Sequence, residues 1–124
     1  MRNPVGWFEL YVNDMPRARH FYEQALGVTL SPLDGSGLEV ELWAFPGGPD
    51  LGGASGALVR MAGVNPGGGG TLVYFSCDDC ADTAARAAAA GGHIHRPKFA
   101  IGPYGFIALV SDTEGNLIGL HSMR

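Results

Sequence analysis

Hydrophobic and polar residues alternate along residues 5–12, and this period of two predicts a strand. Its two faces are Phe8, Leu10 and Val12 on one side, and Trp7, Glu9 and Tyr11 on the other. The period then changes to that of a helix, which begins at the N-cap Asp14 and ends at Gly27. The predicted buried face of this helix is Ala18, Phe21, Tyr22, Ala25 and Leu26.

Three further strands are predicted in the first half of the chain, over residues 28–30, 38–45 and 54–61. We expect Pro32 to close the first of them. Residues 62–70 contain four consecutive glycines, which disfavour regular structure and predict a linker. The run has no following Lys-Ser or Lys-Thr pair and precedes a strand, so we exclude a phosphate-binding loop.

The second half repeats this order of elements. A strand over residues 71–77 leads to a helix from Asp79 to Ala90, and strands follow over 93–99, 104–110 and 117–123. The predicted sheet-facing side of the helix is Ala81, Ala84, Ala85, Ala88 and Ala89. Asp14 lies thirteen residues before Gly27, and Asp78 lies thirteen before Gly91. This duplication predicts two β-α-β-β-β halves around a hollow, which is the natural ligand site.

The sequences VNDMPRARHFYEQALGV, SCDDCADTAARAAAAGG and SDTEGNLIGLHS together resemble the vicinal oxygen chelate superfamily, which includes glyoxalase I, bleomycin-resistance proteins and extradiol dioxygenases. The resemblance implies an α+β fold in which tandem βαβββ modules form a curved, cup-shaped mixed sheet with helices outside. It implies one domain over residues 1–124, with module 1 at about 5–61, a linker at 62–70 and module 2 at about 71–123. It also implies a homodimer.

Enzymes of this superfamily hold a divalent metal in the hollow with His, Gln or Glu. Carried over one position at a time, these ligands fall on Trp7, Leu72 and Gly119, and on or next to Ser55. None of these residues is a suitable ligand for a hard or borderline cation. We therefore expect no metal cofactor.

The favoured hypothesis is a metal-independent protein of the bleomycin-resistance type that binds a small aromatic or amphipathic molecule for sequestration, sensing or resistance. Glu9 would hold a cationic or hydroxylated group, and aromatic rings would supply contact area. The predicted ligand-binding residues are Trp7, Glu9, Glu41, Trp43, Tyr74, Lys98, Tyr104 and His121. For Trp43 the alternative is core packing, and for Lys98 and Tyr104 it is an ordinary crossing loop.

The alternative hypothesis is a glyoxalase-type lyase or isomerase with a shifted site for one divalent metal ion. Glu9, Tyr74 and His121 would be its ligands. Glu9 or Glu41 would then act as general base, and His121 as an acid or a metal ligand. The sequence leaves open whether the protein is an enzyme, and no catalytic residue is predicted.

The net charge of −4 and the isoelectric point near 5.4 argue against nucleic-acid and membrane partners. No targeting segment is visible, and we expect a cytoplasmic protein. Cys77 and Cys80 form a C-x-x-C at a strand-to-helix junction, which we interpret as packing rather than redox or zinc chemistry. His93 and His95 could bind metal, but an exposed strand edge is the favoured interpretation; His20 is predicted to face solvent.

Overall fold

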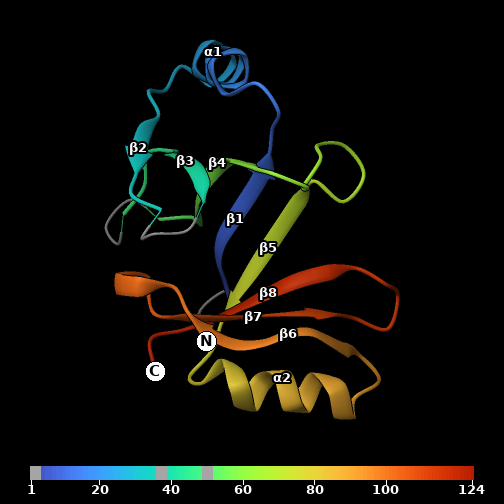
Figure 1. The fold of residues 1–124 in the computed structure, drawn as a ribbon. Coiled ribbons are helices and arrows are strands. Elements are labelled where there is room, and N and C mark those ends of the chain that lie inside the picture. Colours follow the sequence, from blue (N-terminus) through green and yellow to red (C-terminus); the bar gives the residue numbers. More distant parts are fainter. Residues whose placement is uncertain (1–3, 36–38, 49–51) are drawn as a thin grey trace. The chain divides into compact units, whose positions relative to one another are not determined.

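The computed structural model describes residues 4–35, 39–48 and 52–124, so Leu38 of the predicted strand lies outside it. The chain divides into two compact units. The N-terminal unit is Trp7–Thr71; the C-terminal unit is Leu72–Arg124 with the described part of Met1–Gly6. The described part of each unit contains one α-helix, and both helices are labelled in Figure 1.

The N-terminal unit has its strands in the order β2-β3-β4-β1. β1 and β4 are parallel, whereas the pairs β3–β4 and β2–β3 are antiparallel. The elements are β1 (Val5–Tyr11), α1 (Met15–Leu26), β2 (Ser31–Leu33), β3 (Val40–Ala44) and β4 (Ser55–Met61).

The C-terminal unit repeats this arrangement in the order β5-β8-β7-β6. Again the first and last strands, β5 and β8, are parallel and the other pairs are antiparallel. The elements are β5 (Thr71–Ser76), α2 (Cys80–Ala89), β6 (His93–Ala100), a 3-10 turn η1 (Gly102–Tyr104), β7 (Phe106–Ser111) and β8 (Leu117–Ser122). The predicted α+β class and tandem βαβββ modules are therefore confirmed.

Both helices start and stop where the sequence signals placed them. Asp14 caps α1 by accepting a hydrogen bond from the Arg17 backbone N–H at 3.0 Å, and Gly27 ends α1 in the left-handed region at φ 66°. Asp79 caps α2 in the same way, through the Ala81 N–H at 2.9 Å.

The buried faces of both helices differ from the prediction. In α1, Phe21 and Leu26 are 61% and 60% exposed, and Met15 is buried instead. In α2, only Ala84 of the five predicted alanines is buried, and it lies beside the fully buried Cys80. Each buried stripe begins at the first helical residue, which the predicted faces did not include.

The strand predicted over residues 28–30 was wrong by three positions. Leu30 is 2% exposed, and its backbone N–H donates to a Glu23 carboxylate oxygen at 2.9 Å rather than to a strand. The strand is Ser31–Leu33, with Pro32 inside it. β2 stands first in the strand order and is therefore an edge strand, which tolerates a proline because one side of it makes no ladder.

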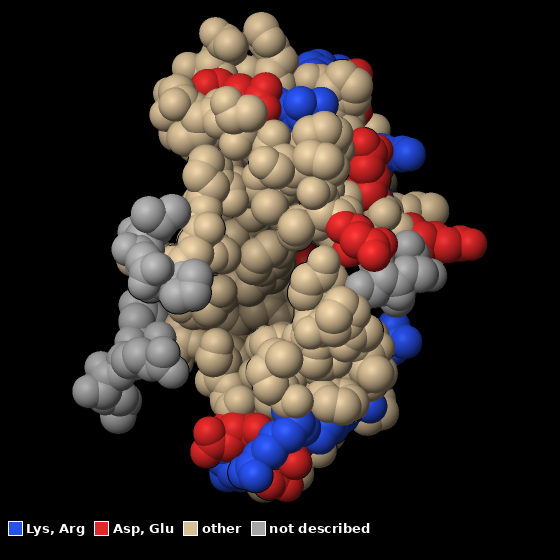
Figure 2. Space-filling model, turned by 90° about the vertical axis from the view of Figure 1, so that its left-hand side faces the viewer, with Lys and Arg blue, Asp and Glu red and all other residues tan. Residues whose placement is uncertain are grey.

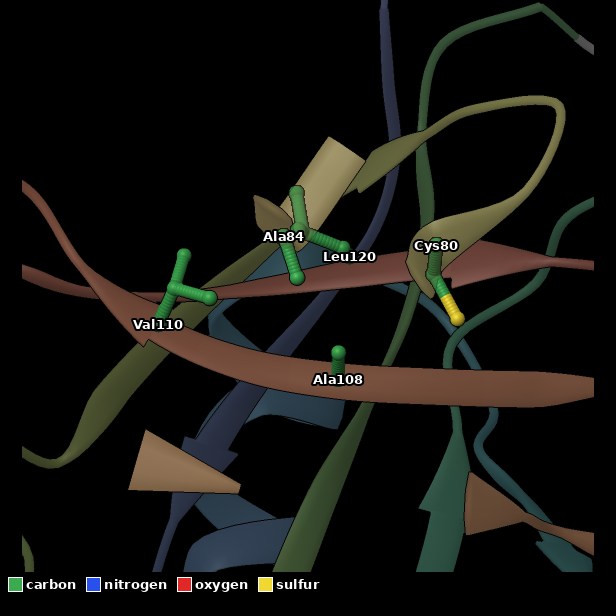
Figure 3. Packing of buried hydrophobic residues seen from close by; sticks show 5 residues of the cluster. All are labelled: Cys80, Ala84, Ala108, Val110 and Leu120. Carbon is green, nitrogen blue, oxygen red and sulfur yellow. The ribbon is translucent and has the colours of Figure 1, made fainter. Parts of the chain in front are cut away.

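Each unit has a hydrophobic cluster between its helix and its sheet. Under α1 the buried residues are Met15, Leu30 and Leu58. Under α2 they are Cys80, Ala84, Ala108, Val110 and Leu120 (Figure 3). In Figure 1, α2 lies along the strands that carry this second cluster.

The glycine-rich segment has no helix or strand, as expected. Gly67 and Gly69 have φ values of 88° and 83°, which favour glycine. Gly70 N–H donates to Gly67 C=O, and Gly70 C=O accepts from Tyr11 N–H, both at 2.8 Å. Neither helix of the described chain is long and apolar enough to cross a bilayer.

Candidate functional site

The superfamily's metal positions fall on the paired first and last strands of each unit. Trp7 and Ser55 are register partners on β1 and β4. In the C-terminal unit, Gly119 on β8 is the register partner of Tyr74 on β5. The two superfamily positions in the N-terminal unit are therefore neighbours. However, Trp7 offers an indole and Ser55 a hydroxyl where the superfamily has metal ligands.

Gly119 has no room for a ligating side chain. A Cβ atom built there meets the ring carbons of Tyr74, which is itself only 7% exposed. Leu72, two residues before Tyr74, is 6% exposed and purely apolar. The residues present do not fit a metal at the superfamily's positions. In the described chain, moreover, no three His, Cys, Asp or Glu side chains group closely enough to hold one.

A row of polar and aromatic side chains replaces these ligands on β1. The Glu9 carboxylate accepts a hydrogen bond from the Trp7 indole N–H at 3.1 Å and another from the Tyr11 hydroxyl at 2.6 Å. All three side chains are half-buried. Because the row alternates with Phe8 and Leu10, it lies on the sheet face opposite α1.

Tyr11 was missing from the predicted ligand-binding residues. The signal for it was present, because Trp7, Glu9 and Tyr11 are spaced two apart and share one face of the strand. The prediction used Tyr11 only as evidence for a strand with alternating faces. In the structure the Tyr11 hydroxyl and the Trp7 indole N–H both donate to the Glu9 carboxylate.

Glu41 and Trp43 lie on the other face of the N-terminal sheet, so they do not join this row. Trp43 packs against the cluster beneath α1, and the Arg19 guanidinium lies 3.5 Å from its ring centroid. The Glu41 carboxylate accepts from the Trp43 indole N–H at 3.1 Å and from Arg60 Nε at 3.2 Å. Trp43 is the register partner of the fully buried Leu58, which explains its orientation.

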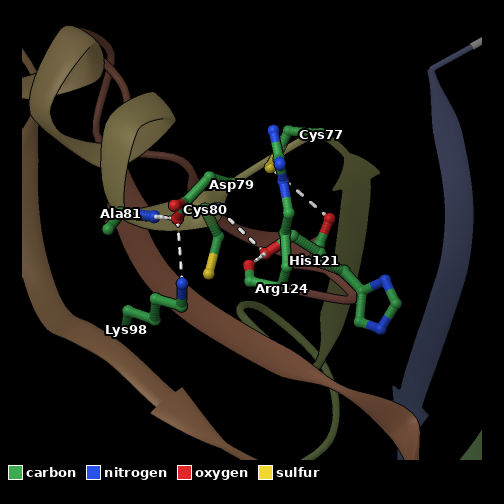
Figure 4. Close-up of polar contacts among 8 residues, drawn as sticks. Cys77, Asp79, Cys80, Ala81, Lys98, His121 and Arg124 are labelled. Carbon is green, nitrogen blue, oxygen red and sulfur yellow. Dashed lines mark hydrogen bonds and ion pairs between the residues drawn. The ribbon is translucent and has the colours of Figure 1, made fainter.

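Lys98 lies on β6, and its side chain contacts the residue that caps the start of α2. Its ammonium donates to the Asp79 carboxylate at 3.0 Å (Figure 4). The same ammonium lies 4.7 Å from the centroid of the Phe106 ring. The hydrogen bond from Lys98, followed by that from the Ala81 N–H, holds the pKa of Asp79 below its usual 3.8. The lysine is thus part of a helix cap.

His121 and Tyr104 contact each other through the backbone. His121 Nε2 lies 2.5 Å from the Tyr104 carbonyl oxygen, so Nε2 carries the proton and donates. Tyr104 is 40% exposed and ends the turn η1. Tyr74 and His121 both lie on the sheet face opposite α2, because the residues that alternate with them, Phe75 and Leu120, pack under α2.

The two cysteines are part of the packing around the start of α2. Cys80 is fully buried, and its backbone N–H donates to the Ser122 hydroxyl at 2.9 Å. The Cys77 thiol donates to the His121 carbonyl at 3.4 Å. Figure 4 shows these contacts. Both thiols adjoin the apolar cluster under α2, which is the packing that the sequence predicts for the C-x-x-C.

The predicted positions of the other histidines are also confirmed. His93 and His95 are exposed on β6, the last strand in the order of its unit, and His20 is exposed on α1.

On the face shown in Figure 2, basic side chains lie beside acidic ones and uncharged residues supply most of the surface.

Comparison with known proteins places the chain in a family. A profile described as the Glyoxalase/Bleomycin resistance protein/Dioxygenase superfamily matches residues 5–120. No curated protein gives a significant match to the sequence.

Several solved structures share the fold. Methylmalonyl-CoA epimerase from Mycobacterium tuberculosis has a TM-score of 0.68 and 14% identity, over 98% of this chain and 88% of that one. A Streptomyces coelicolor methylmalonyl-CoA epimerase variant in complex with 2-nitronate-propionyl-CoA has a TM-score of 0.68 and 16% identity, over 97% and 94%. An uncharacterized Methanosarcina mazei protein has a TM-score of 0.62 and 18% identity, over 98% and 94%. At these identities the likeness concerns the fold alone. By its family profile, the chain belongs to the Glyoxalase/Bleomycin resistance protein/Dioxygenase superfamily.

Proposed function

We propose that this protein is a metal-independent binder of a small organic molecule, of the bleomycin-resistance type, and that it acts by sequestration, sensing or resistance. The observation that carries the proposal is the chemistry at the superfamily's metal positions. Trp7, Ser55, Leu72 and Gly119 offer one hydroxyl and no imidazole or carboxylate. The Tyr74 ring occupies the space that a ligand at position 119 would need.

The row on β1 supports a ligand with a cationic or hydroxylated group attached to a flat apolar body. Two hydrogen bonds from aromatic neighbours orient the Glu9 carboxylate, so it does not need to be ordered when a ligand binds. Its negative charge attracts a cation, and the electron-rich faces of Trp7 and Tyr11 attract the same cation. Aromatic rings also supply large contact areas at low entropic cost.

The C-terminal unit has its own candidate row in Tyr74 and His121. The tautomer that donates from Nε2 to Tyr104 leaves the His121 Nδ1 lone pair as an acceptor. We propose this nitrogen as an acceptor for a ligand donor group. Among the solved relatives in fold, a methylmalonyl-CoA epimerase is in complex with methylmalonyl-CoA and NH4+, which supports only the coarse class of small-molecule ligands.

Isothermal titration with planar cationic compounds and their uncharged analogues tests the proposal. We expect cations to bind better, and Glu9→Gln to weaken them by about 10-fold to 100-fold, since a hydrogen bond to a charged group contributes about 1.5–3 kcal/mol. Glu39→Gln is the matched control, because Glu39 is an exposed carboxylate of the same unit. Equal affinities in wild type and Glu9→Gln would contradict the proposed role of Glu9.

Metal analysis tests the lyase or isomerase alternative. The protein is purified without chelator, and its nickel, zinc, iron and manganese contents are measured. Stoichiometric metal that disappears in both Glu9→Gln and His121→Asn would replace our proposal with the shifted metal site. We expect neither substitution to change the metal content.

Gel filtration tests the expected homodimer. A mass near 13.0 kDa, that of one chain, would contradict it. We also propose a cytoplasmic location. Fractionation of the cells that make the protein, followed by immunoblotting, tests this; recovery outside the soluble cytoplasmic fraction would contradict it.

A further inference from the structure

We propose that His93 and His95 form a surface site for a borderline divalent cation of the Ni²⁺, Cu²⁺ or Zn²⁺ class. The two imidazoles are exposed on β6, with ring centroids 4.8 Å apart and ring planes at 89°. Neither residue is among the side chains proposed above to bind the organic ligand, which are Trp7, Glu9, Tyr11, Tyr74 and His121. The proposal is therefore independent of the function proposed above.

The backbone of β6 exposes the two rings and brings them together. β6 is the last strand in the order of its unit, and among the described strands it pairs with β7 alone, which leaves its other edge open. The register shifts between Ile94 and Arg96, so His95 is an extra residue with no partner opposite it on β7. Such bulges redirect a side chain. With the bulge in place, the ring centroids of His93 and His95 lie 4.8 Å apart.

The spacing of the rings suits chelation. Imidazole nitrogens bind zinc at about 2.0–2.1 Å, and two rings at a tetrahedral angle on one ion have centroids roughly 5 Å apart. The observed 4.8 Å is close to this value. To chelate, the two side chains rotate so that one nitrogen of each ring points to the same cation. Protection of a strand edge requires only polar side chains, so it does not explain why two imidazoles face each other.

Ser111 supplies the contact that orients one of the rings. His95 Nε2 lies 3.1 Å from the Ser111 hydroxyl oxygen, and Ser111 is the register partner of His93. When Nε2–H donates to this hydroxyl, the Nδ1 lone pair of His95 is left for the cation. Metal-bound histidines commonly donate their second ring nitrogen in this way, which fixes tautomer and orientation. Ser111 is thus a positioning residue.

The donor set selects the class of cation. Two neutral imidazoles favour nickel, copper and zinc, whereas calcium and magnesium prefer oxygen ligands. With two protein ligands the remaining positions are filled by water, so the ion is exchangeable. This distinguishes the site from a structural zinc site, which has four protein ligands.

Titration of the tag-free full chain with NiCl₂ tests the proposal. We expect one site per chain, and about 100-fold weaker binding in His93→Asn or His95→Asn, because each substitution removes one arm of the chelate. Ser111→Ala should weaken binding by up to about tenfold. His20→Asn is the matched control, because His20 is an exposed histidine outside the pair, and it should leave the affinity unchanged.

Two results would overturn the proposal. One is nickel binding of wild-type strength in the His93→Asn/His95→Asn double variant. The other is loss of binding in His20→Asn or His121→Asn. Binding of the organic cations should be the same in the double variant as in wild type, so failure of this site and failure of the proposed function are distinguishable.

Discussion

The two units have the same strand order and the same position for the helix, but they fill the space beneath the helix differently. Met15 and Cys80 are the first residues of α1 and α2, and both are at most 2% exposed. Around Met15 the neighbours include Tyr22, Trp43 and Phe45, whereas around Cys80 they are mainly alanines and aliphatic residues. The two units therefore share a backbone arrangement but fill the space beneath their helices with side chains of different sizes.

The paired first and last strands show a second difference. In each unit a ring covers a glycine that is its register partner: Phe8 over Gly56, and Tyr74 over Gly119. Phe8 does so on the side of its helix, since it packs against Phe45 of the α1 cluster. Tyr74 does so on the face opposite α2. Equivalent backbones can therefore place an aromatic ring in the core of one unit and at the candidate site of the other.

The largest expected effect comes from truncating the two equivalent core residues. Met15→Ala should lower the free energy of unfolding by about 2–5 kcal/mol, because it leaves a cavity among large neighbours. Cys80→Ala removes one atom and should cost about 1 kcal/mol. Urea denaturation measures both. Equal losses would show that the two cores are less different than their side-chain volumes indicate.

Adding a methyl group at the covered glycines should have a smaller effect. Gly119→Ala and Gly56→Ala each force a ring aside and should cost about 1–3 kcal/mol. In a Tyr74→Leu background the cost of Gly119→Ala should decrease, which a double-mutant cycle would measure. Gly68→Ala is the control, because no atom lies within 4 Å of the added Cβ. Full stability of Gly119→Ala would contradict the close contact with Tyr74.

The corrected face of α1 predicts a smaller effect still. Phe21 is 61% exposed, so Phe21→Ser should change the free energy of unfolding by less than about 0.5 kcal/mol. Urea midpoints of variant and wild type give this difference. A loss above roughly 1 kcal/mol, the mean effect of a substitution, would instead indicate that another molecule covers Phe21 in solution.

The last prediction concerns the acid titration of the α2 cap. The pKa of Asp79 is lowered in the folded protein, so its carboxylate adds stability above the unfolded pKa, and this is lost as the pH falls through the folded pKa. Lys98→Met should raise the pKa of Asp79 toward 3.8, so acid unfolding should begin at a higher pH. NMR titration of the Asp79 carboxyl carbon measures the shift. An unchanged midpoint would show that Lys98 does not set it.

The sequence alone determined the repeated βαβββ order, the helix caps and the absence of suitable ligands at the superfamily's metal positions. These features depend on local periodicity and on residue identity at fixed spacings. An error of a residue or two in the predicted end of a helix or strand does not change them. The row of Trp7, Glu9 and Tyr11 was readable for the same reason, because strand alternation places its members on one face.

Only the tertiary structure decided which face of each element is covered. Trp43 turned toward α1 because its register partner Leu58 is buried there, and register depends on pairing between strands distant in sequence. The position of Lys98 against Asp79 likewise depends on how β6 lies along α2. Periodicity identifies the two faces of a helix or strand, but the packing partners determine which of these faces is buried.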